Sequence, residues 1–261
     1  MRDLGGSPPS GLTAFDDPEF LKSRQARTLR VLAELLEPQY RLAKEAIEDT
    51  IVFFGSSRVP GPDDDTNHAG LAAMQPYYQA ARELARRLTE WRLEGRRFLI
   101  CTGAGPGIME AANRGAVEGG GRTIGFAINL PDNVEPPNPY VTPDLHFEFH
   151  YFFVRKFWFI YNAKALLVFP GGYGTMDELT EVLTLVQTGK VTKKMGIVLY
   201  GANFWNDVID FDALLRHGVI SQEDRELFVI VDSVDEAFDR VCSFLKDNYG
   251  PSLLEESDLP M

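Results

Sequence analysis

The chain has 261 residues, of which 44% are hydrophobic, and a formal net charge of −12 at pH 7. A chain of this length and composition can bury a substantial core, and its acidic balance disfavours nonspecific binding to nucleic acid. No run of about 18 apolar residues occurs, so no membrane-spanning helix is expected. We therefore expect a globular protein that has neither nucleic acid nor a membrane as its partner.

The N-terminus and the cysteines indicate the compartment. The first residues, MRDLGGSPPSG, lack an apolar signal region, and Cys101 and Cys242 each lie within an apolar pattern. These features are typical of a reduced, cytoplasmic setting. We expect a flexible tail over residues 1–16 and a polar tail over residues 250–261.

Residues 17–48 are predicted to form an N-terminal helical extension. Its apolar stripe includes Leu29, Leu32, Leu35 and Leu36, and we expect Pro38 to interrupt it. The stripe is compatible with an added helical cap on the domain and equally with a subunit contact.

Residues 49–249 are predicted to form one domain, because strands and helices alternate there without a linker. Buried strands are expected over residues 50–54, 98–102, 123–127, 145–149, 163–169, 196–200 and 228–231. Helices are expected over residues 77–92, 108–117, 151–161, from 175 onward, 204–215 and 234–245. This alternation predicts the α/β class, with one doubly wound, Rossmann-like parallel sheet and helices on both faces. Ligands of such a sheet lie beyond the carboxyl ends of its strands.

Three turns rich in small residues follow predicted strands, so they fall at the edge where a ligand is expected. Glycines let a backbone approach a ligand closely, and free N–H groups at a helix start favour an anion. Thr175 is the predicted N-cap of the helix after the third turn, with Asp177 and Glu178 in its first turn. The alternative is that these turns serve packing alone. The turns comprise Gly55 and Ser56; Gly103, Gly105 and Gly107; and Gly171, Gly172 and Gly174.

Two common phosphate-binding fingerprints fail on this sequence. The second turn resembles a dinucleotide-binding loop, but Ile108 occupies the position of the third glycine and the expected acid at the end of the next strand is missing. A Walker A loop fails because Val191 follows Gly189 and Lys190.

Three further segments have two interpretations each. His146, Glu148 and His150 share one face of a predicted strand, but a solvated face explains them more simply than a metal, so we expect no metal site. The proline-rich segment 129–144 is an ordered loop or a lid, with Glu135 and Asn138 as its polar candidates. The aromatic residues of segment 151–161 belong to a buried or interface helix, or else one or two of them stack on a base.

Several motifs together resemble the Lonely Guy (LOG) family, whose members are often labelled lysine decarboxylases. The segment TGAGPGIMEAANRGA precedes Arg155 and Lys156, and PGGYGTMDE matches the family motif PGGxGTxxE from Pro170 to Glu178. The resemblance covers residues 51–245. The N-terminal extension is longer than in the plant-type members and is closer to a larger bacterial group.

This resemblance implies a phosphoribohydrolase that cleaves the N-glycosidic bond of N6-modified adenosine 5′-monophosphates, giving free base and ribose 5-phosphate. It implies catalytic roles for Arg155 and Glu178, no cofactor, and a homodimer or higher homo-oligomer. The alternatives are a nucleotide-binding or carrier protein of this fold without catalysis, and a nucleosidase of broader specificity. The candidate substrate contacts are Gly55, Ser56, Gly103, Gly105, Gly107, Met109, Glu135, Lys156, Gly171, Gly172, Tyr173, Gly174, Thr175 and Thr184.

Overall fold

Seven parallel strands form one sheet in the described part of the chain. The computed structural model describes residues 12–62, 64, 66–129 and 136–250. The strand order is β4-β3-β2-β1-β5-β6-β7, so the chain first builds outward from β1 in one direction and then, from β5, in the other. This confirms the doubly wound parallel sheet. Its topological switch point lies between β1 and β5, where ligands of such sheets bind.

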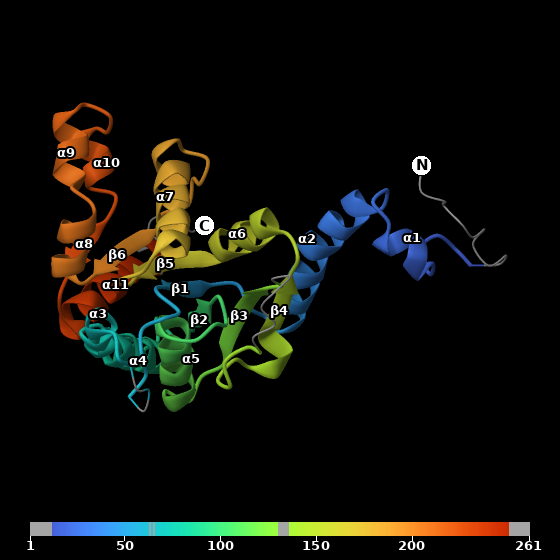
Figure 1. Cartoon of the computed structure of the whole chain (residues 1–261), viewed down its shortest axis with the longest axis horizontal. Coiled ribbons are helices and arrows are strands. Elements are labelled where there is room, and N and C mark those ends of the chain that lie inside the picture. The colour runs from blue at the N-terminus through green and yellow to red at the C-terminus, as the bar shows by residue number, and fades with distance from the viewer. Residues whose placement is uncertain (1–11, 63, 65, 130–135, 251–261) are drawn as a thin grey trace, which may run out of the picture.

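The strands have buried, largely apolar sequences because helices cover both faces of the sheet (Figure 1). Helices α4, α5 and α11 pack on one face, and α6 and α7 pack on the other. The strands are β1 (Thr50–Phe54), β2 (Leu99–Thr102), β3 (Thr123–Ile128), β4 (His146–Phe149), β5 (Ala163–Val168), β6 (Gly196–Tyr200) and β7 (Val229–Val231). The helices are α1 (Pro18–Lys22), α2 (Arg27–Lys44), α3 (Ala69–Ala72), α4 (Gln75–Glu90), α5 (Ile108–Glu118), η1 (Pro143–Leu145), α6 (Phe152–Tyr161), α7 (Tyr173–Gln187), α8 (Ala202–Val208), α9 (Phe211–Arg216), α10 (Gln222–Arg225) and α11 (Val234–Tyr249).

Two predictions about helices away from the site were wrong. The helix predicted over residues 204–215 is two helices, α8 and α9, because the chain is extended at Ile209 and the side chain of Asp210 caps the second helix at the N–H of Ala213. Pro38 does not interrupt the predicted apolar stripe, because it lies buried inside α2. The short helices α3, α10 and η1 were not predicted, since each is a single turn without apolar periodicity.

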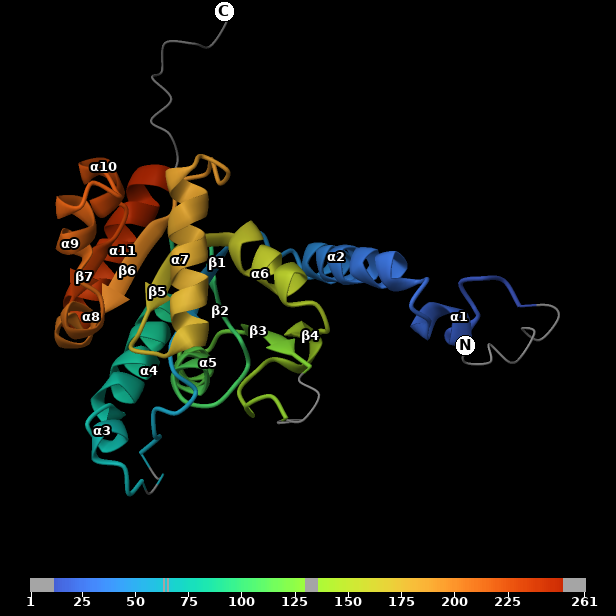
Figure 2. The same cartoon turned by 45° about the horizontal axis from the view of Figure 1, so that its top comes forward.

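The N-terminal helices project from the sheet as an arm (Figure 2). From Glu34 onward, α2 is attached to the domain by hydrogen bonds. The carboxylate of Glu34 accepts from the N–H groups of His150 and Tyr151, and the indole of Trp158 donates to the Glu34 carbonyl. Arg41 donates to the carbonyl of His146. The arm therefore consists of α1 and the part of α2 that precedes these contacts with α6 and β4.

Candidate active site

The three small-residue turns meet at the switch point because backbone hydrogen bonds join them. The Ser56 N–H donates to the Pro170 carbonyl over 3.0 Å, and the Ser56 carbonyl accepts from the Ile108 N–H over 3.1 Å. A Cβ on Gly107, whose φ is +69°, would collide with the backbone of Ser56 and Ser57. Glycine is required there because the left-handed conformation and the close approach both exclude a side chain.

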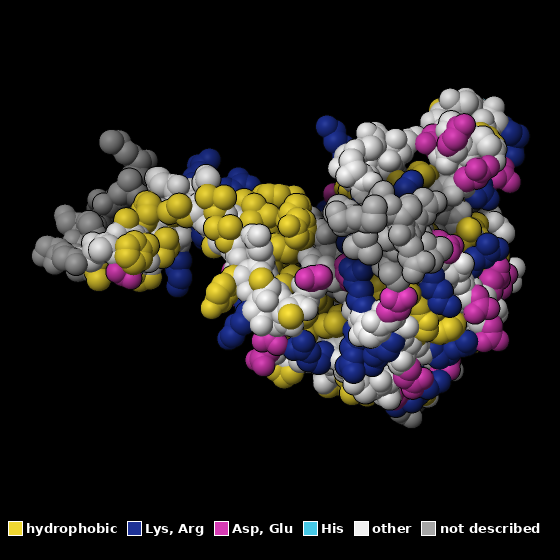
Figure 3. All heavy atoms as spheres, turned by 180° about the vertical axis from the view of Figure 1, so that it is seen from behind, with side chains coloured by type: hydrophobic (Ala, Val, Ile, Leu, Met, Phe, Trp, Pro, Cys, Tyr) yellow, Lys and Arg dark blue, Asp and Glu magenta, His cyan; other side chains and the backbone are white. Residues whose placement is uncertain are grey.

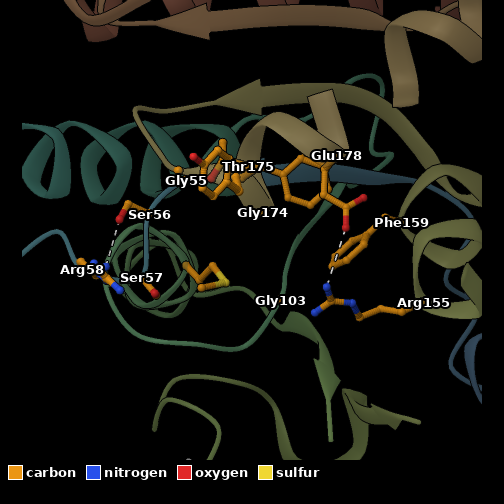
Figure 4. Close-up of a pocket in the computed structure, with 14 residues that line it drawn as sticks. Gly55, Ser56, Ser57, Arg58, Gly103, Arg155, Phe159, Gly174, Thr175 and Glu178 are labelled. Carbon is orange, nitrogen blue, oxygen red and sulfur yellow. Dashed lines mark hydrogen bonds and ion pairs between the residues drawn. The ribbon is translucent and has the colours of Figure 1, made fainter. Parts of the chain in front are cut away.

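A pocket of about 560 Å³ opens at this junction (Figure 4). It takes its walls from all three turns and from helices α6 and α7. Ser56, Ser57 and Arg58 lie on one side of it, whereas Arg155 and Glu178 point toward each other on the other side. Its lining residues are Phe54, Gly55, Ser56, Ser57, Arg58, Gly103, Met109, Arg155, Phe159, Gly172, Tyr173, Gly174, Thr175 and Glu178.

The start of α7 differs from its prediction. Gly172, not Thr175, is the N-cap, and the helix begins at Tyr173. Thr175 is buried against Gly171, where any Cβ would collide with its side chain. Asp177 and Glu178 consequently lie in the second turn rather than the first. The first turn presents free N–H groups, with Gly172 and Gly174 open to the pocket, and such a helix start favours an anion.

Arg155 and Glu178 form a buried ion pair. The Nη2 atom of Arg155 lies 3.7 Å from Oε1 of Glu178, and the side chains are only 14% and 7% exposed. The guanidinium lies 4.9 Å from the ring centroid of Phe152 and 5.5 Å from that of Phe159. Oε2 of Glu178 and Nε of Arg155 are buried without a hydrogen-bond partner among the described residues. The pair therefore has unused polar atoms beside the pocket.

Burial raises the pKa of Glu178 to about 7, although Arg155 and Lys156 act to lower it. The neighbouring carboxylates of Glu181 and Asp177 act in the same direction as burial. Burial also lowers the pKa of Arg155, against the opposing effect of Glu178. At 3.7 Å the two groups are too far apart for a hydrogen bond, so the attraction only partly offsets desolvation. Glu178 thus has a proton affinity suited to chemistry near neutral pH.

The predicted contacts Lys156 and Thr184 lie outside the main pocket. Lys156 also faces α7, but about 100° around α6 from Arg155, and its Nζ contacts Asp177 over 2.7 Å and Glu181 over 2.6 Å. Together with Thr184 it lines a separate, shallow groove between α6 and α7. Adjacent residues on a helix cannot face the same point, so the pair Arg155-Lys156 is divided between two surfaces.

A second cavity of about 340 Å³ continues the main pocket toward β3 and β4. The two share Ser57, Gly103, Met109 and Arg155, so they are adjacent along one edge of the sheet. Gly105 lines this second cavity rather than the first. Gly107 lines neither and acts through the backbone contact with Ser56 and Ser57.

The remaining candidates have other roles or lie outside the described residues. The amide of Asn138 donates to the carbonyls of Ala104 and Gly105 and to Asn113, so it holds the second turn in place. Glu135 lies outside the described residues. His146 and Glu148 line the second cavity, and no group of three or more metal-binding side chains occurs in the described parts of the chain.

Sequence reasoning missed Arg58 and Phe159, although both line the main pocket. Arg58 follows the first turn directly, and a cation at that position was a usable signal. Phe159 was one of seven aromatic residues in its segment, and only the helix geometry selects it. In the described ranges no helix combines the length and the apolar character needed to cross a bilayer.

This chain is similar to a described protein family, to curated proteins and to solved structures. The family model described as "Possible lysine decarboxylase" matches residues 109–241. Probable cytokinin riboside 5′-monophosphate phosphoribohydrolase LOG4 of Oryza sativa subsp. japonica is 26% identical over 208 residues, which cover 78% of this chain and 80% of that protein. A pyrimidine/purine nucleotide 5′-monophosphate nucleosidase of Escherichia coli (strain K12) is 30% identical over 155 residues, 54% of this chain and 33% of that protein. Among solved structures, the molybdenum cofactor carrier protein of Chlamydomonas reinhardtii aligns with 76% of this chain and 98% of its own, with 20% identity and a TM-score of 0.48.

The family model covers half of the chain, including the glutamate and arginine of the buried pair. The chain belongs to the Lonely Guy (LOG) family, the family whose model bears the description "possible lysine decarboxylase".

Proposed function

We propose that this protein hydrolyses the N-glycosidic bond of nucleoside 5′-monophosphates, with N6-modified adenosine monophosphates as its expected substrates. The bond between C1′ of the ribose and the base nitrogen breaks, water supplies a hydroxyl to C1′, and the base nitrogen receives a proton. The observation that carries the proposal is the buried pair of Arg155 and Glu178 beside an amide-lined helix start. Relatives named phosphoribohydrolase and nucleosidase support it.

The order of groups along the site matches the order of groups in a nucleotide. The free N–H groups at the start of α7 suit the phosphate, and Arg58 adds a cation at the same pocket. Glu178 and Arg155 line the same pocket, and Arg155 also lines the second cavity. The second cavity, beyond Gly103 and Met109, is then the place for the base. This order brings C1′ to the buried pair.

Glu178 has the chemistry that the bond cleavage requires. Loss of the base leaves oxocarbenium-like positive charge on the ribose, and a carboxylate in a dry site stabilises such charge or orients the attacking water. The ionised form of Glu178 is the active one for either role. Arg155 lowers the pKa of Glu178 and so favours its ionised form. Its guanidinium can also hold the ribose or the departing base. No step of this reaction requires a metal or an organic cofactor.

Lys156 acts in this proposal by tuning Glu178 rather than from the same pocket. Its ammonium helps to lower the pKa of Glu178, whereas the carboxylates of Glu181 and Asp177 raise it. Lys156 and Thr184 contact substrate only if a second copy presents its pocket to their groove. The exposed rings of Phe152, Phe153, Phe157 and Tyr161 on α6 support a homodimer or larger homo-oligomer.

The expected setting of this reaction is the cytoplasm. Cys101 and Cys242 are buried, free thiols, which supports a reducing compartment.

The test is product analysis of the purified protein. Incubation with AMP, isopentenyladenosine monophosphate and CMP should give free base and ribose 5-phosphate, separated by chromatography. Tight nucleotide binding without turnover would support the carrier alternative, and equal cleavage of purine and pyrimidine monophosphates would support a broader nucleosidase. Incubation with lysine should give no cadaverine, because a pyridoxal enzyme needs a Schiff-base lysine and no described lysine lines the main pocket.

A further inference from the structure

Helix α2 carries two apolar stripes, and only one of them has a partner in the described parts of the chain. The inner stripe packs against the domain core. The outer stripe consists of Leu29, Leu32, Leu36 and Tyr40, which are 47%, 46%, 60% and 69% exposed. An amphipathic helix on the surface of a domain needs the first stripe alone. The inner stripe is Val31, Leu35, Pro38 and Leu42.

The outer stripe has the spacing of a coiled-coil seam. Leu29, Leu32 and Leu36 follow one another at intervals of three and four residues, which places them in one row along the helix. The residues flanking this row are small or uncharged. They are Gln25, Thr28, Ala33, Gln39 and Ala43.

Most of the charged side chains of α2 lie away from the outer stripe. At 100° per residue, Arg27, Arg30, Glu34, Glu37 and Arg41 fall on the other side of the helix, and Lys44 lies beside Tyr40 at the C-terminal edge of the outer stripe. Figure 3 shows hydrophobic side chains gathered along the arm, from α1 to α2. An uncharged apolar face of this kind favours a protein partner. A negatively charged lipid surface would repel a chain of net charge −12.

The exposed area fits an interface between two arms. Leu12 and Phe15, near α1, are 50% and 75% exposed and extend the apolar surface. With side-chain areas of 150–250 Å² for the larger residues, the six exposed side chains present roughly 600 Å² in each copy. Complete coverage of both surfaces would bury about 1,200 Å², the lower end of the range of specific protein interfaces.

We propose that the outer stripe of α2 packs against the same stripe of a second copy of this chain, antiparallel about a two-fold axis close to Leu32. Antiparallel pairing follows from where the arm is attached. From Glu34 onward, α2 is hydrogen-bonded to the domain through Glu34 and Arg41, whereas α1 and the first turn of α2 make no such bonds within the described residues. A parallel pair would bring two acidic domains side by side, whereas an antiparallel pair places them at opposite ends of the paired helices.

This contact is separate from the aromatic residues of α6 and does not depend on the proposed reaction. The antiparallel register places Leu29 opposite Leu36 of the second copy. Thiols can therefore report both the contact and its direction, because Cys101 and Cys242 are buried and leave an introduced cysteine as the reactive one.

The first experiment co-expresses the full chain carrying Leu29→Cys with the full chain carrying Leu36→Cys, followed by mild oxidation. A covalent dimer should form between the two variants, and neither variant alone should crosslink to itself. Crosslinking of each variant to itself would mean a parallel pair and would overturn the proposed direction. The control is Val219→Cys, which is 65% exposed far along the chain and should give no covalent dimer.

The second experiment measures mass in solution by light scattering. Leu29→Asp combined with Leu36→Asp should halve the mass of the wild-type assembly, while Val219→Asp should leave it unchanged. An unchanged mass in the double variant, with no crosslink in the first experiment, would show that the outer stripe serves a different partner and that the proposal is wrong.

Discussion

The guanidinium of Arg155 lies 3.7 Å from the carboxylate of Glu178, close enough for strong attraction but too far for a hydrogen bond. The two groups come from neighbouring helices, α6 and α7, on one face of the sheet. Glu178 keeps a buried oxygen without a partner among the described residues. A substrate that enters the pocket can therefore bind the pair without first breaking a hydrogen bond within it.

Replacing Glu178 by Gln should lower kcat by about 10²- to 10⁴-fold, the usual contribution of a positioned acid or base. Gln has nearly the same volume, so the fold should persist, as circular dichroism can verify. The assay is release of ribose 5-phosphate from AMP. A fully active variant would mean that the carboxylate has no role in the chemistry.

The activity of the wild-type protein should rise with pH and level off above pH 7, because the ionised form of Glu178 is active and burial raises its pKa to about 7. The second ionisation of the substrate phosphate has a pKa of about 6, which is low enough to be distinguished from the ionisation of Glu178 in the same profile. The measurement is kcat/KM from pH 5 to 9. Activity that is constant or falls over this range would contradict the ionised-carboxylate mechanism.

Lys156→Met should move the rising limb of this profile to higher pH, because it removes a positive charge that lowers the pKa of Glu178. Met keeps most of the length of the side chain and its packing on α6. Lys156→Arg, which retains the charge, is the matched control and should leave the limb in place. A purely structural role for Lys156 would change kcat or stability without shifting the profile.

Glu178→Gln should also stabilise the protein at pH 8 relative to the wild type. The pKa of Glu178 is about 7 in the folded protein and near 4.5 when unfolded, so the folded state holds the proton more tightly. As the pH rises from 4.5 to 7, the wild type consequently loses stability on the order of 3 kcal/mol, and the loss persists at higher pH. Melting temperatures at pH 5 and pH 8 test this. The exposed Glu236→Gln should show no such difference between the two pH values.

Gly107→Ala should cost more stability and activity than Gly120→Ala. Both glycines have φ near +70°, so both substitutions carry the left-handed penalty of about 1–2 kcal/mol. Only at position 107 would the new methyl group meet the backbone of Ser56 and Ser57, whereas nothing lies within 4 Å at position 120. Urea unfolding and the KM for AMP would separate the two effects. Equal losses in both variants would mean that the turns do not depend on this contact.

The sheet was largely predictable because buried parallel strands have continuous apolar sequences. The bounds of β1 and β6 agree with prediction, and the turns after β1, β2 and β5 do lie at one edge. The start of α7 could not be predicted from Thr175, since its position depends on how closely Gly171 approaches Ser56 and Thr175 in three dimensions. The division of Arg155 and Lys156 between two surfaces depends on how α6 is rotated about its axis. The sequence does not define this rotation, because aromatic residues occur all around the helix.

The peptide of Ser56 joins two turns at once through its N–H and its carbonyl. These bonds are made by main-chain atoms. The side chains of Ser57, Arg58 and Tyr173, which line the pocket, are therefore not needed to hold the turns together. Directed evolution could diversify those three positions to change which nucleotide is accepted, while leaving the scaffold beneath them intact.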